Sequence, residues 1–152
     1  MATSFLGELM TATHNFGASP IRAAATADTF KAALFLASAT INASTTVYST
    51  TGEVSGTGYT AGGVTVTNAT PPTATNASAT AGVAYWTPSA SFVYTSVTLS
   101  TAFDAVLVYN STQSDKAVSV HTFGSQTITA GTFTLTMPSN TTTTALLRLA
   151  TT

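Results

Sequence analysis

Short segments in which threonine or valine alternates with another residue type recur along this chain, and glycine or proline separates many of them. Residues 64–67 (VTVT), 92–99 (FVYTSVTL) and 132–137 (TFTLTM) are examples. Threonine and valine are β-branched, and their restricted χ1 rotamers suit the pleated surface of a strand. A period of two places alternate side chains on opposite faces of a sheet. The pattern therefore predicts an all-β fold.

The alternation and the turn residues together predict a series of strands. They cover residues 29–38, 64–68, a short segment ending at 86, 92–99, 105–109, 117–123, 127–129, 132–137 and 145–149. For residues 29–38 a helix competes with the strand. Residues 110–115 (NSTQSD) are typical of a turn, so the strands on either side should form a hairpin. About eight short strands with glycine and proline turns indicate a jelly-roll-like β-sandwich, with Phe133, Leu135 and Met137 facing inward.

The length of 152 residues suits a single domain. Residues 1–28 are expected to form an N-terminal arm or short helix, because apolar residues recur there every three or four positions. Residues 29–152 would form the single β-sandwich domain. Residues 42–50 and 73–80 are polar or low in complexity and are expected to be loops, the second following a pair of prolines that excludes a central strand.

The most distinctive loop is residues 51–68, TGEVSGTGYTAGGVTVTN, in which five glycines precede a strand. A phosphate-binding loop would need a helix N-terminus and a nearby lysine, and neither follows here. We therefore expect the glycines to supply turns with positive φ. Glu53 and Tyr59 are the distinctive side chains of this loop, and we expect it to lie near a protein–protein interface.

The chain carries little charge. Only 6% of its residues are charged, with four Lys or Arg and five Asp or Glu, against an average of about 25%. Nucleic acid is not an expected direct partner because its backbone is bound by clusters of Lys and Arg. No apolar run approaches the roughly 20 residues of a membrane span. The absence of cysteine excludes disulfides and thiolate metal sites. Such a composition suits a protein that is packed against other proteins.

No catalytic, cofactor or metal site is predicted. General acid–base catalysis needs carboxylates or histidines brought together, and none of the few candidates falls in a recognisable spacing. His14 has no suitable neighbours in sequence for a metal site. Asp104 and Asp115 read as turn residues at strand ends. His121 alternates with Val118 and Val120 on an expected strand and should be a surface or interface histidine.

The single tryptophan, Trp86, allows two interpretations. With Tyr85 and Tyr94 it could form a platform on which a carbohydrate stacks. Aromatic residues at strand positions are more often part of a core or an interface. The candidate interface residues are therefore Glu53, Tyr59, Trp86 and His121.

Two longer segments resemble small structural proteins of tailed bacteriophages. Residues 28–68 contain DTFKAALF, a threonine-rich loop and EVSGTGYTAGG, and residues 105–137 contain a strand, a turn with KA, a strand ending in FG, and ITAGTFTLT. Together they cover about half of the chain. Residues 21–27 depart from the pattern as an insert-like stretch, which leaves the path of the N-terminal segment open.

The resemblance implies a virion component without enzymatic activity. Within that group the chain looks most like the jelly-roll cement or decoration proteins, which sit on a head built from an HK97-type major capsid protein and commonly act as dimers or trimers. It implies synthesis in the host cytoplasm and a final position on the capsid surface. A neck, tail or fibre component, with possible host-glycan contacts, is the alternative. A virion glycosidase is poorly supported because no pair of carboxylates is placed for it.

Overall fold

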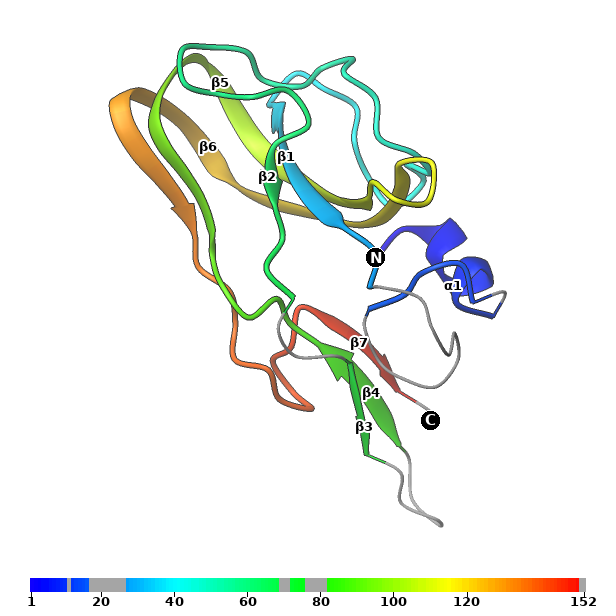
Figure 1. The fold of residues 1–152 in the computed structure, drawn as a ribbon. Helices are drawn as coiled ribbons and strands as arrows, with labels where there is room; N and C mark the ends of the chain where they lie inside the picture. Colours follow the sequence, from blue (N-terminus) through cyan, green and yellow to red (C-terminus); the bar gives the residue numbers. More distant parts are fainter. Residues whose placement is uncertain (11, 17–26, 69–71, 76–81, 151–152) are drawn as a thin grey trace.

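The computed structural model describes residues 1–10, 12–16, 27–68, 72–75 and 82–150. Most of the regular structure is β, and the strands form two antiparallel sheets (Figure 1). The predicted all-β class is confirmed at this level. The elements in chain order are α1 (Thr3–Met10), β1 (Phe30–Leu36), β2 (Val64–Thr65), β3 (Thr73–Thr75), β4 (Val83–Trp86), β5 (Phe92–Asn110), β6 (Lys116–Leu135) and β7 (Leu147–Ala150).

The larger sheet has the strand order β2-β1-β5-β6. Strand β1 pairs with β5 from Phe30 opposite Asn110 to Leu36 opposite Phe103. Five of the seven β1 residues are buried, and residues 105–110 of β5 are buried without interruption. The sequence of a strand that is buried on both faces is a continuous apolar run, which is why apolar and polar residues alternate only weakly in β1 and in the end of β5. The predicted strand at residues 29–38 is confirmed, and the competing helix is wrong.

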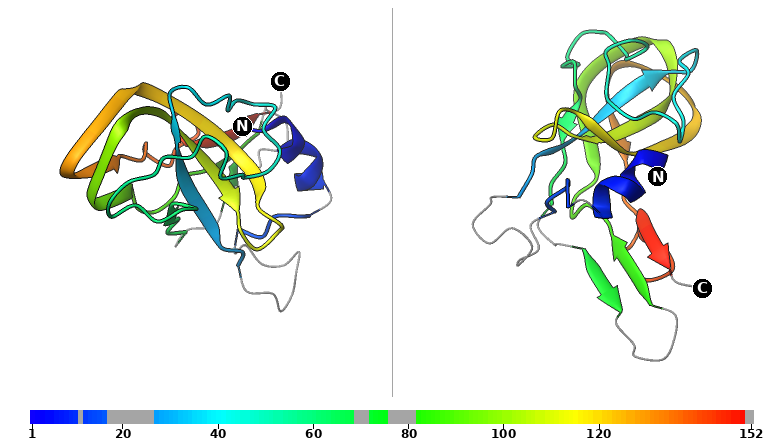
Figure 2. Two further views of the ribbon diagram at one scale, coloured as in Figure 1. Left: turned by 90° about the horizontal axis from the view of Figure 1, so that it is seen from above. Right: turned by 90° about the vertical axis from the view of Figure 1, so that its right-hand side faces the viewer.

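The predicted hairpin around residues 110–115 is also confirmed, but its strands are much longer than predicted. Strand β5 has 19 residues and β6 has 20, so the segments 92–99 and 105–109 form one strand, as do 117–123, 127–129 and most of 132–137. The pairing register shifts between Leu99 and Phe103, opposite residues 126–128 of β6, and again between Phe103 and Ala105, opposite the stretch around Gly124. Bulges of this kind bend a strand pair without ending it. The chain therefore bends at the positions where the sequence predicted interruptions, and β5 and β6 bend together while they stay paired (Figure 2).

The smaller sheet has the order β3-β4-β7 and lies beyond the end of the larger one (Figure 1). The short strand ending at Trp86 and the final strand are confirmed as β4 and β7. The prediction of a loop at residues 73–80 is wrong for residues 73–75, which form β3 and pair with β4 from Thr73 opposite Tyr85. Pro72 precedes this edge strand, a position where its missing N–H removes no ladder bond. Residues 76–80 lie outside the described residues.

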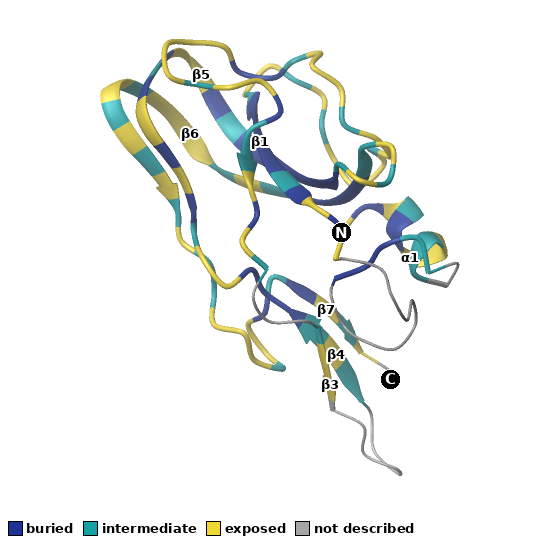
Figure 3. Cartoon of the chain, in the orientation of Figure 1, coloured by how far each residue is buried: buried dark blue, intermediate teal, exposed yellow. Residues whose placement is uncertain are grey.

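The core runs through both sheets and under the helix (Figure 3). Phe133, Leu135 and Met137 pack against it as partly buried residues, as predicted. The N-terminal segment forms the short helix that was one of its two predicted states, and Phe5 is buried while Leu6 is 48% exposed. The insert-like stretch 21–27 lies almost wholly outside the described residues.

Candidate functional site

Glu53 lies inside the molecule, although the sequence analysis placed it among the interface candidates. Its carboxylate is the acceptor for three hydrogen bonds: from the Tyr48 hydroxyl at 2.6 Å, the Tyr59 hydroxyl at 2.8 Å and the Gly62 N–H at 2.7 Å. The residue is buried and bridges to Phe35 of β1. Glu53 therefore holds the glycine-rich loop on the sheet, and its assignment as an interface residue stays a prediction.

The glycines of this loop allow the chain to touch the sheet backbone. Gly58 and Gly63 have φ values of +78° and +72°. A Cβ at Gly58 would overlap the Ser96 carbonyl oxygen, and one at Gly63 would overlap the carbonyl oxygen of Ala32. The predicted positive φ is confirmed for Gly52, Gly58, Gly62 and Gly63, whereas Gly56 does not have one. The phosphate-binding alternative finds no support, because a strand follows the loop and Glu53 already occupies the Gly62 N–H.

Tyr59 is half-buried between the loop and the larger sheet. Its hydroxyl donates to Glu53 and accepts the Leu34 N–H at 3.0 Å, and its ring stacks on Tyr94 with the centroids 6.0 Å apart. Burial, reinforced by the nearby Glu53 carboxylate, raises the pKa of Tyr59 far above its ordinary value. The hydroxyl is therefore protonated at any ordinary pH, and it links loop to strand.

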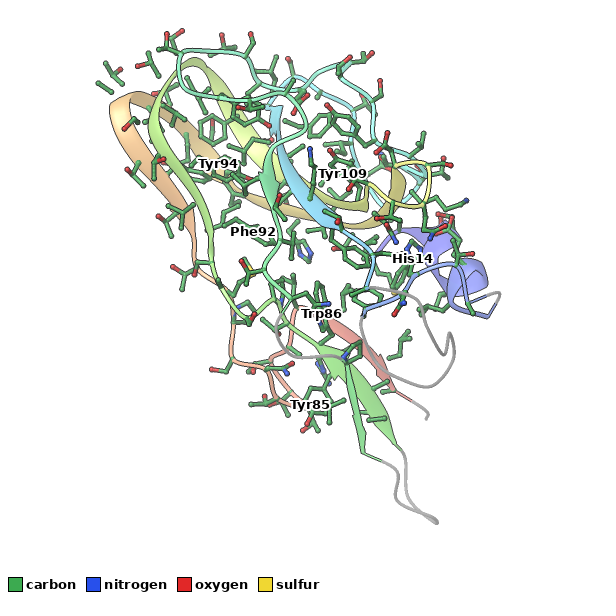
Figure 4. The ribbon with its side chains drawn as sticks, viewed as in Figure 1. His14, Tyr85, Trp86, Phe92, Tyr94 and Tyr109 are labelled. Atoms are coloured by element: carbon green, nitrogen blue, oxygen red, sulfur yellow. The ribbon has the colours of Figure 1, made fainter. Side chains whose placement is uncertain are left out.

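Trp86 is a core residue, and its exposed fraction is only 2%. Its Nε1–H donates to Asn68 Oδ1 at 2.7 Å, and its ring makes an edge contact with Phe16 at 4.9 Å between centroids (Figure 4). Tyr94 is equally buried, at 3%. A sugar stacks on an exposed aromatic face, so the proposed carbohydrate platform is wrong for this chain. The alternative interpretation of Trp86 as a core aromatic is confirmed.

His121 lies on β6 and is half-buried. Its Nε2 is 2.9 Å from Ser119 Oγ, which confirms that the two residues share one face of the strand. Burial, together with the N-terminal ammonium group, lowers the pKa of His121 to about 4. The imidazole is consequently neutral at pH 7. Its assignment as an interface residue stays a prediction.

The structure brings together a polar cluster that the sequence did not predict. His14 Nε2 lies 2.8 Å from Glu8 Oε2, and the Asn110 side-chain amide donates to His14 Nδ1 at 3.0 Å and to Asp28 Oδ2 at 2.7 Å. Lys116 Nζ donates to Glu8 at 3.1 Å. Since Nδ1 accepts a hydrogen bond, Nε2 carries the ring proton and donates a hydrogen bond to the Glu8 carboxylate. The cluster ties α1 to the β5–β6 turn (Figure 4).

The chemistry open to this cluster is limited by its burial. Burial lowers the pKa of His14, although Glu8 opposes the shift. Burial also acts against ionisation of Glu8, but its hydrogen bonds to His14 and Lys116 outweigh this and its pKa is lowered. The His14 side chain is 0% exposed and both ring nitrogens are occupied. The histidine–carboxylate pair therefore holds the helix against the sheet, and neither ring nitrogen of His14 is accessible to exchange a proton with a substrate.

Glu8 and His14 are only six residues apart, but the sequence does not indicate the rest of the cluster, because His14 and Asn110 are 96 residues apart and Asn110 and Asp28 are 82 apart. Asp115 lies in the β5–β6 turn, as predicted, whereas Asp104 lies within β5 and not at a strand end. Among the described residues there is no group of three or more His, Asp or Glu side chains that could hold a metal ion.

An apolar cleft of about 120 Å³ lies between α1 and the smaller sheet. Its lining includes Phe5, Leu9, Phe16, Trp86 and Leu147, and almost no polar surface faces it. A cleft without polar groups cannot orient a substrate, because orientation and specificity come from a few placed polar atoms.

Comparison of the chain with models of known protein families, with curated proteins and with solved structures gives no match. Within the part of the chain that the structure describes, no helix has the length and apolar character needed to cross a membrane.

Proposed function

We propose that this protein is a bacteriophage capsid cement, or decoration, protein that binds the outside of the head and ties major capsid protein subunits together against the pressure of the packaged DNA. Its partners would be an HK97-type major capsid protein and further copies of itself, without direct contacts to nucleic acid or membrane. It would have no enzymatic activity. Its two sheets would form a jelly-roll-like sandwich. The segments at residues 28–68 and 105–137 that resemble tailed-phage structural proteins motivate this assignment.

The observation that carries the proposal is the inward direction of the acidic residues. Of five acidic residues in the chain, Asp28 and Glu53 are buried and Glu8 is 12% exposed at its side chain. Each accepts hydrogen bonds from within the chain. The outer surface is thus even less charged than the composition indicates. Such a surface has few ionised groups to desolvate when neighbours make contact, which suits a protein bound in many adjacent copies.

The surface offered to the shell is the outer face of the β5–β6 pair at the end that lies away from the connecting turn. The exposed residues there are uncharged: Val93 and Thr95 on β5, and Thr127, Thr129, Thr132 and Thr134 on β6. Between Ala117 and Leu135 the strand has no Asp, Glu, Lys, Arg or Pro. A surface of threonine methyl and hydroxyl groups can be buried against several subunits at once, and simultaneous contacts hold a protein whose individual interfaces are modest.

The test is a density map of the virus particle together with the copy number of this protein per particle. A cement protein would cover the head surface at a copy number comparable with that of the major capsid protein. In a re-binding assay on particles that lack the protein, Thr134→Lys should weaken binding, while Thr143→Lys, in an exposed loop, should not. A protein confined to a neck, tail or fibre would overturn the proposal and support the alternative virion role.

A further inference from the structure

Strand β6 is an edge strand of the larger sheet, at the edge opposite β2 (Figure 1). One edge pairs with β5 along its whole length. On the other edge, contacts within the described residues are confined to its beginning: Val47 bridges to Lys116, the Thr46 carbonyl accepts the Ala117 N–H, and the Ala2 N–H donates to the Val118 carbonyl at 2.9 Å. Beyond Val118 the outer edge has no hydrogen-bonded neighbour among the described residues. An unpaired edge of this kind is a template for another strand.

The direction of the backbone groups on this edge follows from the register. The Leu34 carbonyl accepts an N–H of the glycine-rich loop, so it faces away from β5. The backbone N–H and C=O of its cross-strand neighbour Val106 then point away from β1 and toward the β6 partner His121. Residues next to one another in a strand point to opposite edges, so the N–H and C=O groups of Val120 and Thr122 point outward. The Val118 carbonyl, which faces Ala2, agrees with this alternation.

The free edge has definite limits. Ala2 covers it at Val118. At the other end the register shifts between the pair Ala105–Thr122 and the pair Phe103–Gln126, so a bulge turns the strand aside after Thr122. The available window is about residues 119–123, close to the length of an ordinary strand. It contains no charged residue and no proline, the usual devices that prevent edge pairing.

We propose that this window pairs with the same window of a second copy of the chain, antiparallel and about a two-fold axis at His121. The N–H and C=O of Val120 would then bond to those of Thr122 in the partner copy, and the reverse pair would form by symmetry. An isologous contact requires a self-complementary surface, and two outward residues placed symmetrically about His121 provide one. The two larger sheets would become one continuous sheet of eight strands.

A second copy fits this edge better than a charged partner does. No side chain in the window supplies a charge that would select an oppositely charged strand. The two His121 rings would face each other across the axis as neutral imidazoles at pH 7, because burial and the nearby N-terminal ammonium group lower the pKa of each ring. The inference rests on the proposed function, because it gives the self-contact of a cement protein a location, and it places that contact on an edge separate from the threonine face assigned to the shell.

Sedimentation velocity of the full-length protein over a concentration series tests the inference. The wild type should form a dimer. Thr122→Pro removes one outward N–H from each copy without removing a bond to β5, and it should weaken dimerisation about 30-fold. Thr122→Lys should weaken it as well, by placing two ammonium groups near the axis. Thr134→Lys is the matched control on the same strand and should leave the dimer intact.

Amide hydrogen exchange supplies the second measurement, since the Val120 and Thr122 amides should be protected only in the dimer. A wild type that remains monomeric at millimolar concentration overturns the inference, as does a dimer that Thr134→Lys disrupts and Thr122→Pro does not. A protein that binds particles in many copies yet stays monomeric would refute the dimer and leave the cement function standing. A protein that dimerises through this edge but does not bind particles would support the dimer and refute the cement function.

Discussion

Replacement of Glu53 by alanine tests whether this carboxylate holds the glycine-rich loop on the sheet. The substitution removes the acceptor for the Tyr48 and Tyr59 hydroxyls and for the Gly62 N–H. A buried donor left without a partner costs about 1–3 kcal/mol, and hydrogen bonds to a charged group lie at the upper end of this range. The Tyr48 hydroxyl is the most accessible of the three and can turn to water. The remaining two donors give an expected loss of about 4 kcal/mol in the free energy of unfolding.

A loss of this size is easily measured. With a urea m-value of about 2 kcal/mol per molar, the midpoint of unfolding should fall by about 2 M. Trp86 is the only tryptophan and is buried, so its fluorescence follows the transition. Ser55→Ala, at an exposed position in the same loop, is the control and should change stability by less than about 0.5 kcal/mol.

A double-mutant cycle separates the hydrogen bond from other effects of the substitution. Glu53→Ala and Tyr59→Phe should each destabilise, and together they should destabilise by about 1–2 kcal/mol less than the sum, because they remove the same bond. If Glu53→Ala lowers the free energy of unfolding by less than about 1 kcal/mol, or the two changes are additive, the carboxylate is not the fastening of this loop.

Three further predictions address the backbone contact, the half-buried histidine and the polar cluster. Gly63→Ala should destabilise by more than about 2 kcal/mol, because its positive φ and the nearby Ala32 carbonyl exclude a Cβ, whereas Gly124→Ala has open space and should be neutral or stabilising in the same urea titration. The pKa of His121 is about 4 in the folded protein and lies below its unfolded value, so the neutral ring contributes fully to the free energy of unfolding above pH 6.5, and this contribution is lost as the pH falls toward 4. The loss is at most about 3 kcal/mol, and His121→Gln should flatten the corresponding pH dependence of thermal stability. Asn110→Leu should destabilise by about 3 kcal/mol in urea, because it removes the donor to His14 Nδ1 and one of the donors to the buried Asp28 carboxylate.

The sequence predicts those elements of the fold that local physics determines. Residues 105–109 are apolar on both faces, and residues 110–115 combine polar turn residues, so the centre of the sheet and its hairpin could be placed correctly. The continuity of β5 and β6 could not be predicted, because exposed serine and threonine near residue 100 resemble a loop until a partner strand bends with them. The pairing of β3 with β4 likewise depends on tertiary contacts that a low-complexity segment does not indicate.

The candidate residues show the same limit. Glu53 and Tyr59 were recognised as distinctive, but a rare charge in a loop suggests exposure, and only the fold reveals that three donors converge on that carboxylate. Trp86 was interpreted as a core or interface residue and lies in the core, while its bond to Asn68 has no local signature. His14 appeared to lack partners because its partner Asn110 is distant in sequence.

The use of acidic side chains inside the chain connects the fold to the proposed role. A glycine-rich loop leaves backbone N–H groups that need acceptors, and a threonine-rich chain supplies few strong ones; a carboxylate accepts several hydrogen bonds at once. Glu53 does this for the loop and Asp28 for the N-terminal segment, where it accepts from Asn15 and Asn110. Both residues thereby stabilise the fold and leave fewer acidic groups on the surface. A contact between neighbouring copies then has fewer ionised groups to desolvate, so one placement of charge serves both stability and close packing.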